Sequence, residues 1–277
     1  MRKIQKIITP KMIMEGAGVK LRRIFGPEQS SQFDPFLLFD HFGSADPQDY
    51  LKGFPWHPHR GIETVTYLLR GEIAHADSIG NKGVIRSGEI QWMTAGSGII
   101  HQEMPQPFEG EMQGFQLWVN LPKAKKMSDP QYRGIAKDEL VIVKKDDATI
   151  KIVAGKIGDK KGPVENLSTE VEYVEIELSG TYQHDTKKKT IIIYVIEGSL
   201  IIGNQNISHH HAALLEDKGE IVLTGKAHFL LIAGNPLHEP IAWAGPIVMN
   251  TQQELEEAFQ ELDEGNFIKV GKVHKLK

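Results

Sequence analysis

The sequence contains no cysteine. Disulfide bonds and thiolate ligands are therefore excluded, and any metal site must use nitrogen and oxygen donors. No segment approaches the roughly 18 consecutive apolar residues of a membrane span, and no apolar signal core follows the basic residues at the start of the chain. The net charge of −4 supplies no positive field that would attract nucleic acid or anionic lipid. We expect a cytoplasmic protein without membrane association, for which direct nucleic-acid binding is not expected.

The length of the chain, 277 residues, suits two domains of about 130 to 140 residues each. Short strand-like segments recur at intervals of about 8 to 12 residues, a rhythm typical of all-β sandwiches and barrels. We expect a solvated loop around the basic residues 123–126 to join the two halves. The sequence therefore predicts an all-β protein with one domain over residues 1–134 and a second over residues 135–277.

Two pairs of polar side chains stand out within residues 54–103. His57 and His59 form the first pair, and His101 and Glu103 form the second. Side chains two residues apart on a strand point to the same face, and a following proline favours extended backbone at His57. Imidazole nitrogen and carboxylate oxygen suit a divalent first-row metal. A histidine pair also fits a loop or a hydrogen-bonded core contact, so the spacing alone leaves both roles open.

The other histidines carry weaker signals. His41 lies among aromatic residues, which favours packing or hydrogen bonding over metal ligation. His75 can face the interior or the solvent, and its strand pattern does not decide between them. Three adjacent histidines, His209, His210 and His211, cannot all bind one ion if they alternate along a strand. We interpret these three as an exposed tract without a native role.

Longer motifs resemble those of the pirin family, which belongs to the cupin superfamily. The most specific are residues 54–69 (FPWHPHRGIETVTYLL) and residues 91–104 (QWMTAGSGIIHQEM). Further matching pieces are residues 34–43, 114–122, 239–246 and 249–251. The resemblance covers nearly the whole chain and is weaker in the first part of its second half. It implies two cupin barrels in tandem, each a double-stranded β-helix or jelly roll, with a metal in the N-terminal one.

Carried over residue by residue, the resemblance places the pirin metal ligands at His57, His59, His101 and Glu103. Generic cupins instead supply a glutamate shortly after the second histidine, where Glu63 stands. The pirin pattern takes its carboxylate from the second motif. We therefore interpret Glu63 as a strand residue or as a partner that supports the ligands.

The second half repeats the pattern of the first. Residues 190–200 echo residues 64–73. This alignment places His184 opposite His57, but a threonine stands opposite the second histidine and no histidine-x-glutamate pair follows. The second domain is thus expected to keep the barrel without the ligand set, which predicts one mononuclear metal per chain.

One short helix is expected near the C-terminus, over residues 250–262. Thr251 and Glu254 have the spacing of a capping box, and Gly265 would end the helix. Its apolar stripe comprises Leu255, Ala258, Phe259 and Leu262. We interpret it as a structural helix that packs on a sheet.

Three imidazoles and one carboxylate leave two positions free on a six-coordinate ion, as an oxygenase needs for substrate and dioxygen. The resemblance implies a metal-dependent dioxygenase that opens flavonols such as quercetin with O2 and releases carbon monoxide, with Glu103 as general base. Fe(II) is the first choice of metal, and manganese, cobalt, nickel, copper or zinc also suit these ligands. Phe54, Trp56 and Trp92 either wall an aromatic pocket or belong to the barrel core.

The resemblance also leaves a non-enzymatic alternative open. Some pirins act as iron-dependent, redox-responsive regulators that bind a transcription factor or a metabolic enzyme. The partner of this chain would then be a protein instead of a flavonol-like substrate and O2. A third possibility is that flavonol turnover is a side activity of a site with another substrate. No residue in the sequence separates these three hypotheses, and we expect a monomer.

Overall fold

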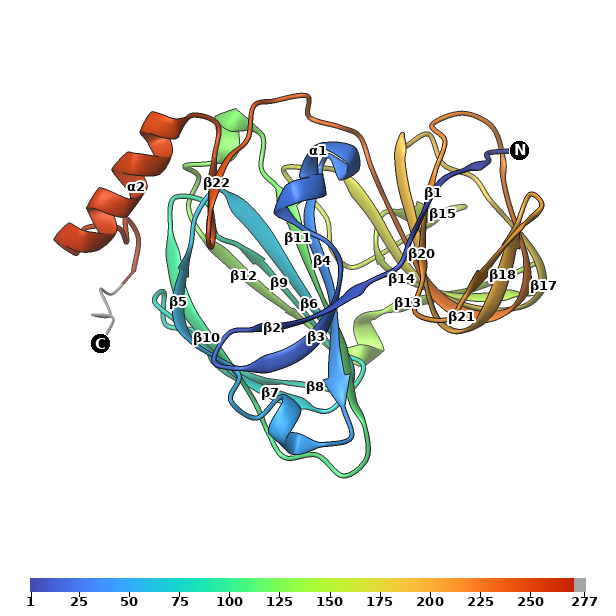
Figure 1. The fold of residues 1–277 in the computed structure, drawn as a ribbon, viewed down its shortest axis with the longest axis horizontal. Helices are drawn as coiled ribbons and strands as arrows, with labels where there is room; N and C mark the ends of the chain where they lie inside the picture. Colours follow the sequence, from blue (N-terminus) through green and yellow to red (C-terminus); the bar gives the residue numbers. More distant parts are fainter. Residues whose placement is uncertain (272–277) are drawn as a thin grey trace. The chain divides into compact units, whose positions relative to one another are not determined.

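The computed structural model describes residues 1–271, which form two compact units (Figure 1). The first barrel comprises residues 12–31, 36–137 and 237–271, and the second barrel comprises residues 1–11, 32–35 and 138–236. Each end of the chain thus belongs to the barrel built mainly by the opposite half. The boundaries 1–134 and 135–277 stay a prediction, and the sequence carried no sign of this exchange of ends.

The second barrel is built on one eight-stranded antiparallel sheet. Its order is β1-β20-β18-β21-β17-β14-β13, with β19 paired to β18. The strands are β1 (Ile4–Ile8), β13 (Val141–Lys145), β14 (Ala148–Ala154), β17 (Val171–His184), β18 (Thr190–Ile202), β19 (Gln205–Ser208), β20 (Ala212–Leu215) and β21 (Ile221–Gly234). The short strands β15 (Lys156–Ile157) and β16 (Lys160–Lys161) pair with each other.

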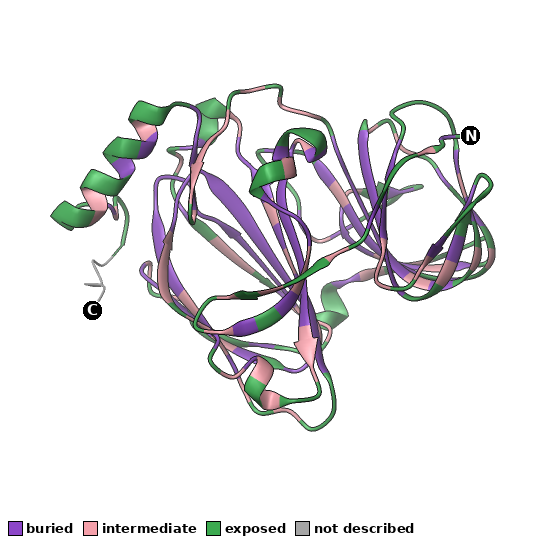
Figure 2. Cartoon of the chain, viewed as in Figure 1, coloured by how far each residue is buried: buried purple, intermediate pink, exposed green. Residues whose placement is uncertain are grey.

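Alternating β-branched residues explain the core of the second barrel. Ile191, Ile193 and Val195 of β18 all belong to one buried apolar cluster, because residues two apart share a face of the strand. The same cluster takes in side chains from β14, β17 and β21. Figure 2 shows buried stretches along these strands, interrupted by intermediate and exposed residues. The interior of the second barrel is therefore filled mainly by hydrocarbon.

The first barrel combines two larger sheets with a C-terminal hairpin and helix. The strand orders are β12-β9-β6-β11-β4-β3-β2 and β5-β10-β7-β8, and β22 pairs with β23. The strands are β2 (Lys11–Glu15), β3 (Val19–Phe25), β4 (Phe36–Ser44), β5 (Phe54–His59), β6 (Ile62–Arg70), β7 (Glu72–Asp77), β8 (Lys82–Arg86), β9 (Ile90–Thr94), β10 (Ile99–Pro105), β11 (Met112–Asn120), β12 (Gln131–Ile135), β22 (Ala242–Ala244) and β23 (Ile247–Met249). The all-β prediction with two barrels is confirmed.

Helices are few and short. Helix α1 spans Ser30–Phe33, and 3-10 turns cover Pro27–Gln29, Pro47–Asp49, Lys123–Lys125 and Lys137–Glu139. No helix in the described part of the chain has the length and apolar character needed to cross a membrane.

The expected C-terminal helix is present as α2 (Gln252–Glu264). Thr251 caps it through the predicted capping box with Glu254, and Gly265 ends it in the left-handed region at φ 75°. Leu255 and Ala258 are buried, whereas Phe259 is 38% exposed. The apolar stripe that packs inward is therefore narrower than the sequence pattern predicted.

The basic segment 123–126 differs from the solvated loop predicted for it. Lys123 and Lys125 are exposed, but Lys126 is buried. Its ammonium group donates to the Gly61 carbonyl at 2.8 Å, the Asn120 side-chain oxygen at 2.7 Å and the Val248 carbonyl at 2.9 Å. A lysine with its three donors satisfied can be buried. Lys126 thus ties β23 to the start of β6 within the first barrel.

We predict that Lys126→Met destabilises the first barrel by about 2 to 4 kcal/mol, because it leaves buried oxygen atoms without a donor. Lys125→Met removes an exposed lysine one residue away and should change stability by less than about 0.5 kcal/mol. Urea unfolding followed by tryptophan fluorescence measures both. Equal stability of the two variants would contradict the structural role of Lys126.

Candidate metal centre

Strand pairing brings the two predicted ligand pairs to one place. β5 and β10 are antiparallel neighbours, and His57 lies directly opposite His101. On its other edge β10 pairs with β7, which places His75 opposite Glu103. The register of β5 and β10 shifts between His101 and Glu103, a bulge that redirects side chains locally. Pairing in the four-stranded sheet therefore brings the two motifs together in space, although they lie about forty residues apart in the sequence.

Three imidazoles converge on one point. One ring nitrogen each of His57, His59 and His101 lies within 4.8 Å of the other two, and the Nε2 atoms of His57 and His59 are 3.1 Å apart. The ring centroids of His57 and His101 are separated by 4.4 Å. His59 and His101 are buried. This geometry matches the three-histidine part of the predicted ligand set.

Backbone carbonyls fix which nitrogen faces the cluster. His57 Nδ1–H donates to the Pro55 carbonyl at 2.8 Å, and His59 Nδ1–H donates to the Pro246 carbonyl at 3.1 Å. A neutral imidazole has one proton, so each Nε2 presents a lone pair to the cluster. Such hydrogen bonds to the remote nitrogen typically orient histidine ligands of metals.

His101 supplies the observation that tests whether a cation fits. Neither of its ring nitrogens has a hydrogen-bond partner among the described residues, although the side chain is 0% exposed. A buried polar atom without a partner is costly. A cation among the three lone pairs would engage one of the two His101 nitrogens and remove that part of the cost, so these residues fit a divalent metal.

The histidines have the protonation state that metal binding requires. Burial lowers the pKa of His57, His59 and His101, and nearby imidazoles lower the pKa of His59 and His101 further. All three are therefore neutral near pH 7. Neutral imidazoles bind a metal without first releasing a proton.

Glu103 lies at the edge of this cluster. Its Oε1 accepts a hydrogen bond from the Thr66 hydroxyl at 2.8 Å, while Oε2 has no hydrogen-bond partner among the described residues. Glu103 lines the same cavity as His57 and His59, but its oxygens lie outside the 4.8 Å group of the three histidines. Its role as fourth ligand stays a prediction.

Glu63 takes the role of a strand residue. It accepts hydrogen bonds from the Trp92 indole at 3.1 Å and the Thr94 hydroxyl at 2.8 Å. These contacts hold its carboxylate on the face of β6 opposite to Thr66, since neighbouring residues of a strand alternate. Trp92 is fully buried on that face and belongs to the barrel core.

The other histidines considered in the sequence analysis lie outside the cluster. His41 packs on Phe115 with a centroid separation of 4.7 Å, in the packing role expected for it. His75 faces the interior, stacked on Tyr132 and 5.5 Å from the His101 ring. His209, His210 and His211 lie in the turn between β19 and β20, so the strand assumed for them is absent there.

A cavity of about 810 Å³ adjoins the candidate metal centre within the first barrel. Its walls include Phe42, Phe54, Trp56, Trp118 and Trp243. Phe54 and Trp56 were candidates for such a pocket from their sequence positions. Trp118 and Trp243 were missed, because only strand pairing and the fold of the C-terminal segment bring them there. The volume suits a small organic molecule.

The C-terminal segment completes this site. Trp243 and Pro246 line the cavity, and the Pro246 carbonyl orients His59. Arg60, the residue after His59, is buried and donates to Glu261 at 2.6 Å and to the Phe267 carbonyl at 2.9 Å. Arg60 therefore anchors the segment that holds a predicted ligand in position.

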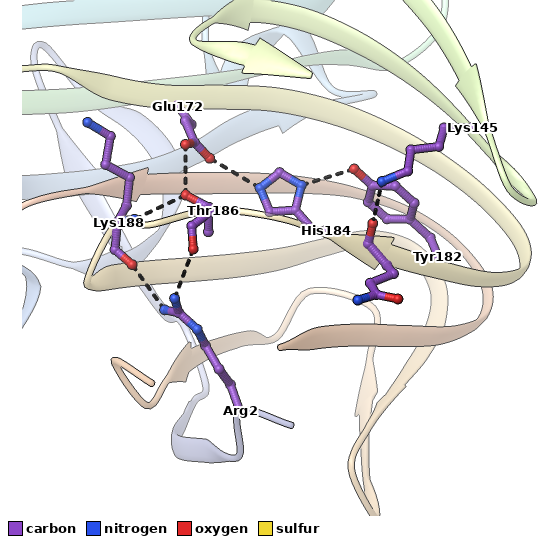
Figure 3. Close-up of polar contacts among 8 residues, drawn as sticks. Arg2, Lys145, Glu172, Tyr182, His184, Thr186 and Lys188 are labelled. Atoms are coloured by element: carbon purple, nitrogen blue, oxygen red, sulfur yellow. Dashed lines mark hydrogen bonds and ion pairs between the residues drawn. The ribbon is translucent and has the colours of Figure 1, made fainter. Parts of the chain in front are cut away.

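The second barrel has no comparable histidine cluster among the described residues. Figure 3 shows His184, the counterpart of His57, between two partners. The Tyr182 hydroxyl donates to His184 Nδ1 at 3.0 Å, and Nε2–H donates to Glu172 at 3.1 Å. Thr186 also donates to Glu172, at 2.7 Å. Both nitrogens of His184 are therefore engaged within the protein.

Another group in the second barrel, Glu175, Glu177 and His228, has metal-ligand atoms within 4.8 Å of one another. Glu175 already accepts from Lys151 at 2.9 Å and from His228 at 2.7 Å, and Glu177 is exposed. The lysine provides the positive charge that a metal would otherwise supply. One metal per chain stays a prediction.

Comparisons with known proteins agree with this architecture. The family description "Pirin" matches residues 18–119, and "Pirin C-terminal cupin domain" matches residues 173–268. The chain is 39% identical to a Pseudomonas aeruginosa protein named as a candidate quercetin 2,3-dioxygenase, covering 95% of this chain and 97% of that protein. It is 39% identical to the protein named Pirin from Homo sapiens, covering 93% of this chain and 91% of that protein. A crystal structure titled quercetin 2,3-dioxygenase from Acinetobacter baumannii superposes with a TM-score of 0.88 at 32% identity, covering 96% and 98% of the two chains.

We predict that His101→Ala loses stoichiometric binding of divalent metal, because one of three converging lone pairs disappears. Metal analysis after dialysis against Fe(II) or Ni(II) under anaerobic conditions measures this. A matched variant with alanine at His209, His210 and His211 should still bind one metal ion per chain. Full retention by His101→Ala would refute the site.

A second prediction concerns the anchor at Arg60. Arg60→Met should weaken metal affinity by about tenfold, since loss of a partner that orients a ligand typically costs 10- to 100-fold. Competition with a chelator gives the affinity. Lys269→Met removes the other partner of Glu261, at 2.7 Å, and should leave the affinity within about twofold. Equal affinities in both variants would show that the anchor does not act on the site.

Proposed function

The chain belongs to the pirin family of the cupin superfamily, and from this premise we propose that it is a metal-dependent dioxygenase. Its substrate would be a flavonol such as quercetin, opened by O2 with release of carbon monoxide. Related proteins that carry the name quercetin 2,3-dioxygenase support this choice of reaction. The observation that carries the proposal is the convergence of three imidazole lone pairs at an aromatic-walled cavity.

Four side chains would hold one divalent ion. His57, His59 and His101 offer neutral nitrogen donors, and Glu103 offers one carboxylate oxygen. This set suits Fe(II) as the first choice, and manganese, cobalt, nickel, copper and zinc as further candidates. When bound, the ion would supply Lewis acidity toward the flavonol oxygen and a site for dioxygen.

Glu103 would act as the general base in addition to its role as a ligand, which requires its carboxylate to swing partly off the metal. Thr66 holds Oε1 by donating a hydrogen bond at 2.8 Å, which leaves Oε2 available to accept the proton of the flavonol 3-hydroxyl. The surrounding cavity wall is largely apolar, and a water-poor environment strengthens an interaction between a carboxylate and a hydroxyl proton.

The aromatic walls would orient the substrate. Trp118 lies edge-on to His59 with centroids 5.0 Å apart, and Trp243 lies 5.9 Å from Trp118. A planar flavonol between such rings gains offset or edge contacts. The two tryptophans thus place an aromatic surface beside the metal ligands, where the reacting oxygen of the substrate must lie.

We predict that the protein, loaded anaerobically with Fe(II), consumes quercetin and O2 and releases carbon monoxide, and that Glu103→Gln lowers kcat by about 100-fold or more. Flavonol absorbance and gas analysis follow the reaction. Glu111→Gln, at an exposed carboxylate, is the matched control and should retain wild-type kcat. Metal content of each protein is measured in parallel.

The two contrary outcomes have different meanings. Turnover that persists in metal-loaded Glu103→Gln would show that Glu103 is not the general base, although the protein would still be a dioxygenase. Absence of turnover by fully iron-loaded wild type would contradict the dioxygenase and favour the regulatory alternative. Pull-down experiments with Fe(II)- and Fe(III)-loaded protein would then test for a redox-dependent protein partner.

A further inference from the structure

A row of polar side chains crosses the cavity wall, which is otherwise largely apolar. In the seven-stranded sheet Arg23 pairs with Asp40, Asp40 with Gln116 and Gln116 with Thr66. Residues directly opposite in antiparallel strands share a face, and all four line the cavity. The row begins beside the metal centre, because Thr66 donates to Glu103, and it ends at Arg23.

The rows on either side of it are largely apolar. Leu38 and Trp118 are paired on one side, and Phe42 and Gly114 are paired on the other. Leu38, Phe42 and Trp118 also line the cavity. A molecule lying on this wall would therefore meet hydrocarbon on both sides of a narrow polar track.

The remote end of the row holds three charged groups. Arg23 binds Asp40 through two hydrogen bonds, at 2.9 Å and 2.8 Å, and donates a third to Glu15 at 2.8 Å. Two carboxylates thus face one guanidinium, and Glu15 also lines the cavity. Arg23 has only donors, whereas each carboxylate oxygen keeps lone pairs that can accept further hydrogen bonds. This cluster, the Glu15–Arg23–Asp40 group, presents acceptors to the cavity.

Burial makes unsatisfied acceptors costly at this position. Asp40 is 4% exposed, and burial raises its pKa to about 6 although the Arg23 guanidinium opposes the shift. A wholly apolar ligand would displace water from these oxygens without replacing its hydrogen bonds. A ligand that carries hydroxyl donors would replace them.

The spacing of the sheet sets the size of such a ligand. Asp40 and Thr66 lie two strands apart, which corresponds to about 10 Å at the usual distance between neighbouring strands. This exceeds the width of one aromatic ring. A substrate with its reacting oxygen near Glu103 would need a second ring to reach the Glu15–Arg23–Asp40 group.

We propose that the Glu15–Arg23–Asp40 group is a specificity subsite that accepts hydrogen bonds from hydroxyl groups on the substrate ring remote from the metal. The inference rests on the proposed function, and it names the residues that would distinguish one flavonol from another. Neutral aromatic molecules hydroxylated at both ends are preferred over those hydroxylated only near the metal. Loss of the Glu15 or the Asp40 carboxylate lowers this preference and leaves the contacts of the substrate oxygen near Glu103 unchanged.

The test compares two flavonols that differ only at the remote ring. Quercetin has two hydroxyls there, and galangin has none. For Glu15→Gln and Asp40→Asn we expect the quercetin-to-galangin ratio of kcat/KM to fall at least fivefold, the effect of about one hydrogen bond to a charged group. The kcat/KM for galangin should stay within about twofold of wild type. Glu109→Gln, at an exposed position outside the cavity, should leave the ratio unchanged.

The outcomes separate this inference from the proposed function. If wild type turns over both flavonols and the ratio is unchanged in both variants, the subsite is refuted and the dioxygenase stands. If wild type turns over neither, the same ratio is measured from dissociation constants with Ni(II)-loaded protein. A fivefold fall in that ratio supports the subsite although the dioxygenase fails, and an unchanged ratio or no binding refutes it. Glu15→Gln alters a partly exposed side chain and keeps the test available if Asp40→Asn does not fold.

Discussion

The hydrogen bonds from histidine Nδ1 atoms to backbone carbonyls are the interactions on which the site depends. They turn the Nε2 lone pairs of His57 and His59 toward each other, an arrangement that is unfavourable without a cation between them. One of the two carbonyls belongs to Pro246, far along the chain. The geometry of the centre therefore depends on how the C-terminal segment packs on the first barrel, through Arg60 and Lys126.

The two barrels use the same strand pattern for different purposes. The second barrel fills its interior with aliphatic side chains, and its one aligned histidine, His184, is engaged by Tyr182 and Glu172. The first barrel instead keeps a cavity with a polar row between apolar rows. Such a cavity sacrifices packing contacts, which is consistent with a site that a ligand completes.

The local features of this chain could be predicted from its sequence. A spacing of two residues picked out His57 with His59 and His101 with Glu103, and the structure brings the three histidines together. The capping box located α2. Contacts with backbone carbonyls could not be predicted, since any residue type supplies a carbonyl. The burial of Lys126 and the partners of Arg60 depend on such carbonyls, and the cavity position of Trp243 depends on the fold of the C-terminal segment. The polar row could not be predicted either, because it depends on which residues pair between neighbouring strands.

X-ray absorption spectroscopy of the Fe(II)-loaded protein counts the ligands of the proposed metal site directly. Multiple scattering from imidazole rings reports the number of histidine ligands, and the first coordination sphere gives the total number of nitrogen and oxygen donors, so the oxygen donors follow by difference. We expect three imidazoles and at least one oxygen ligand on a single iron per chain, with one imidazole lost in His59→Ala. A site with two or fewer imidazoles in wild type, or an unchanged spectrum in His59→Ala, would contradict it.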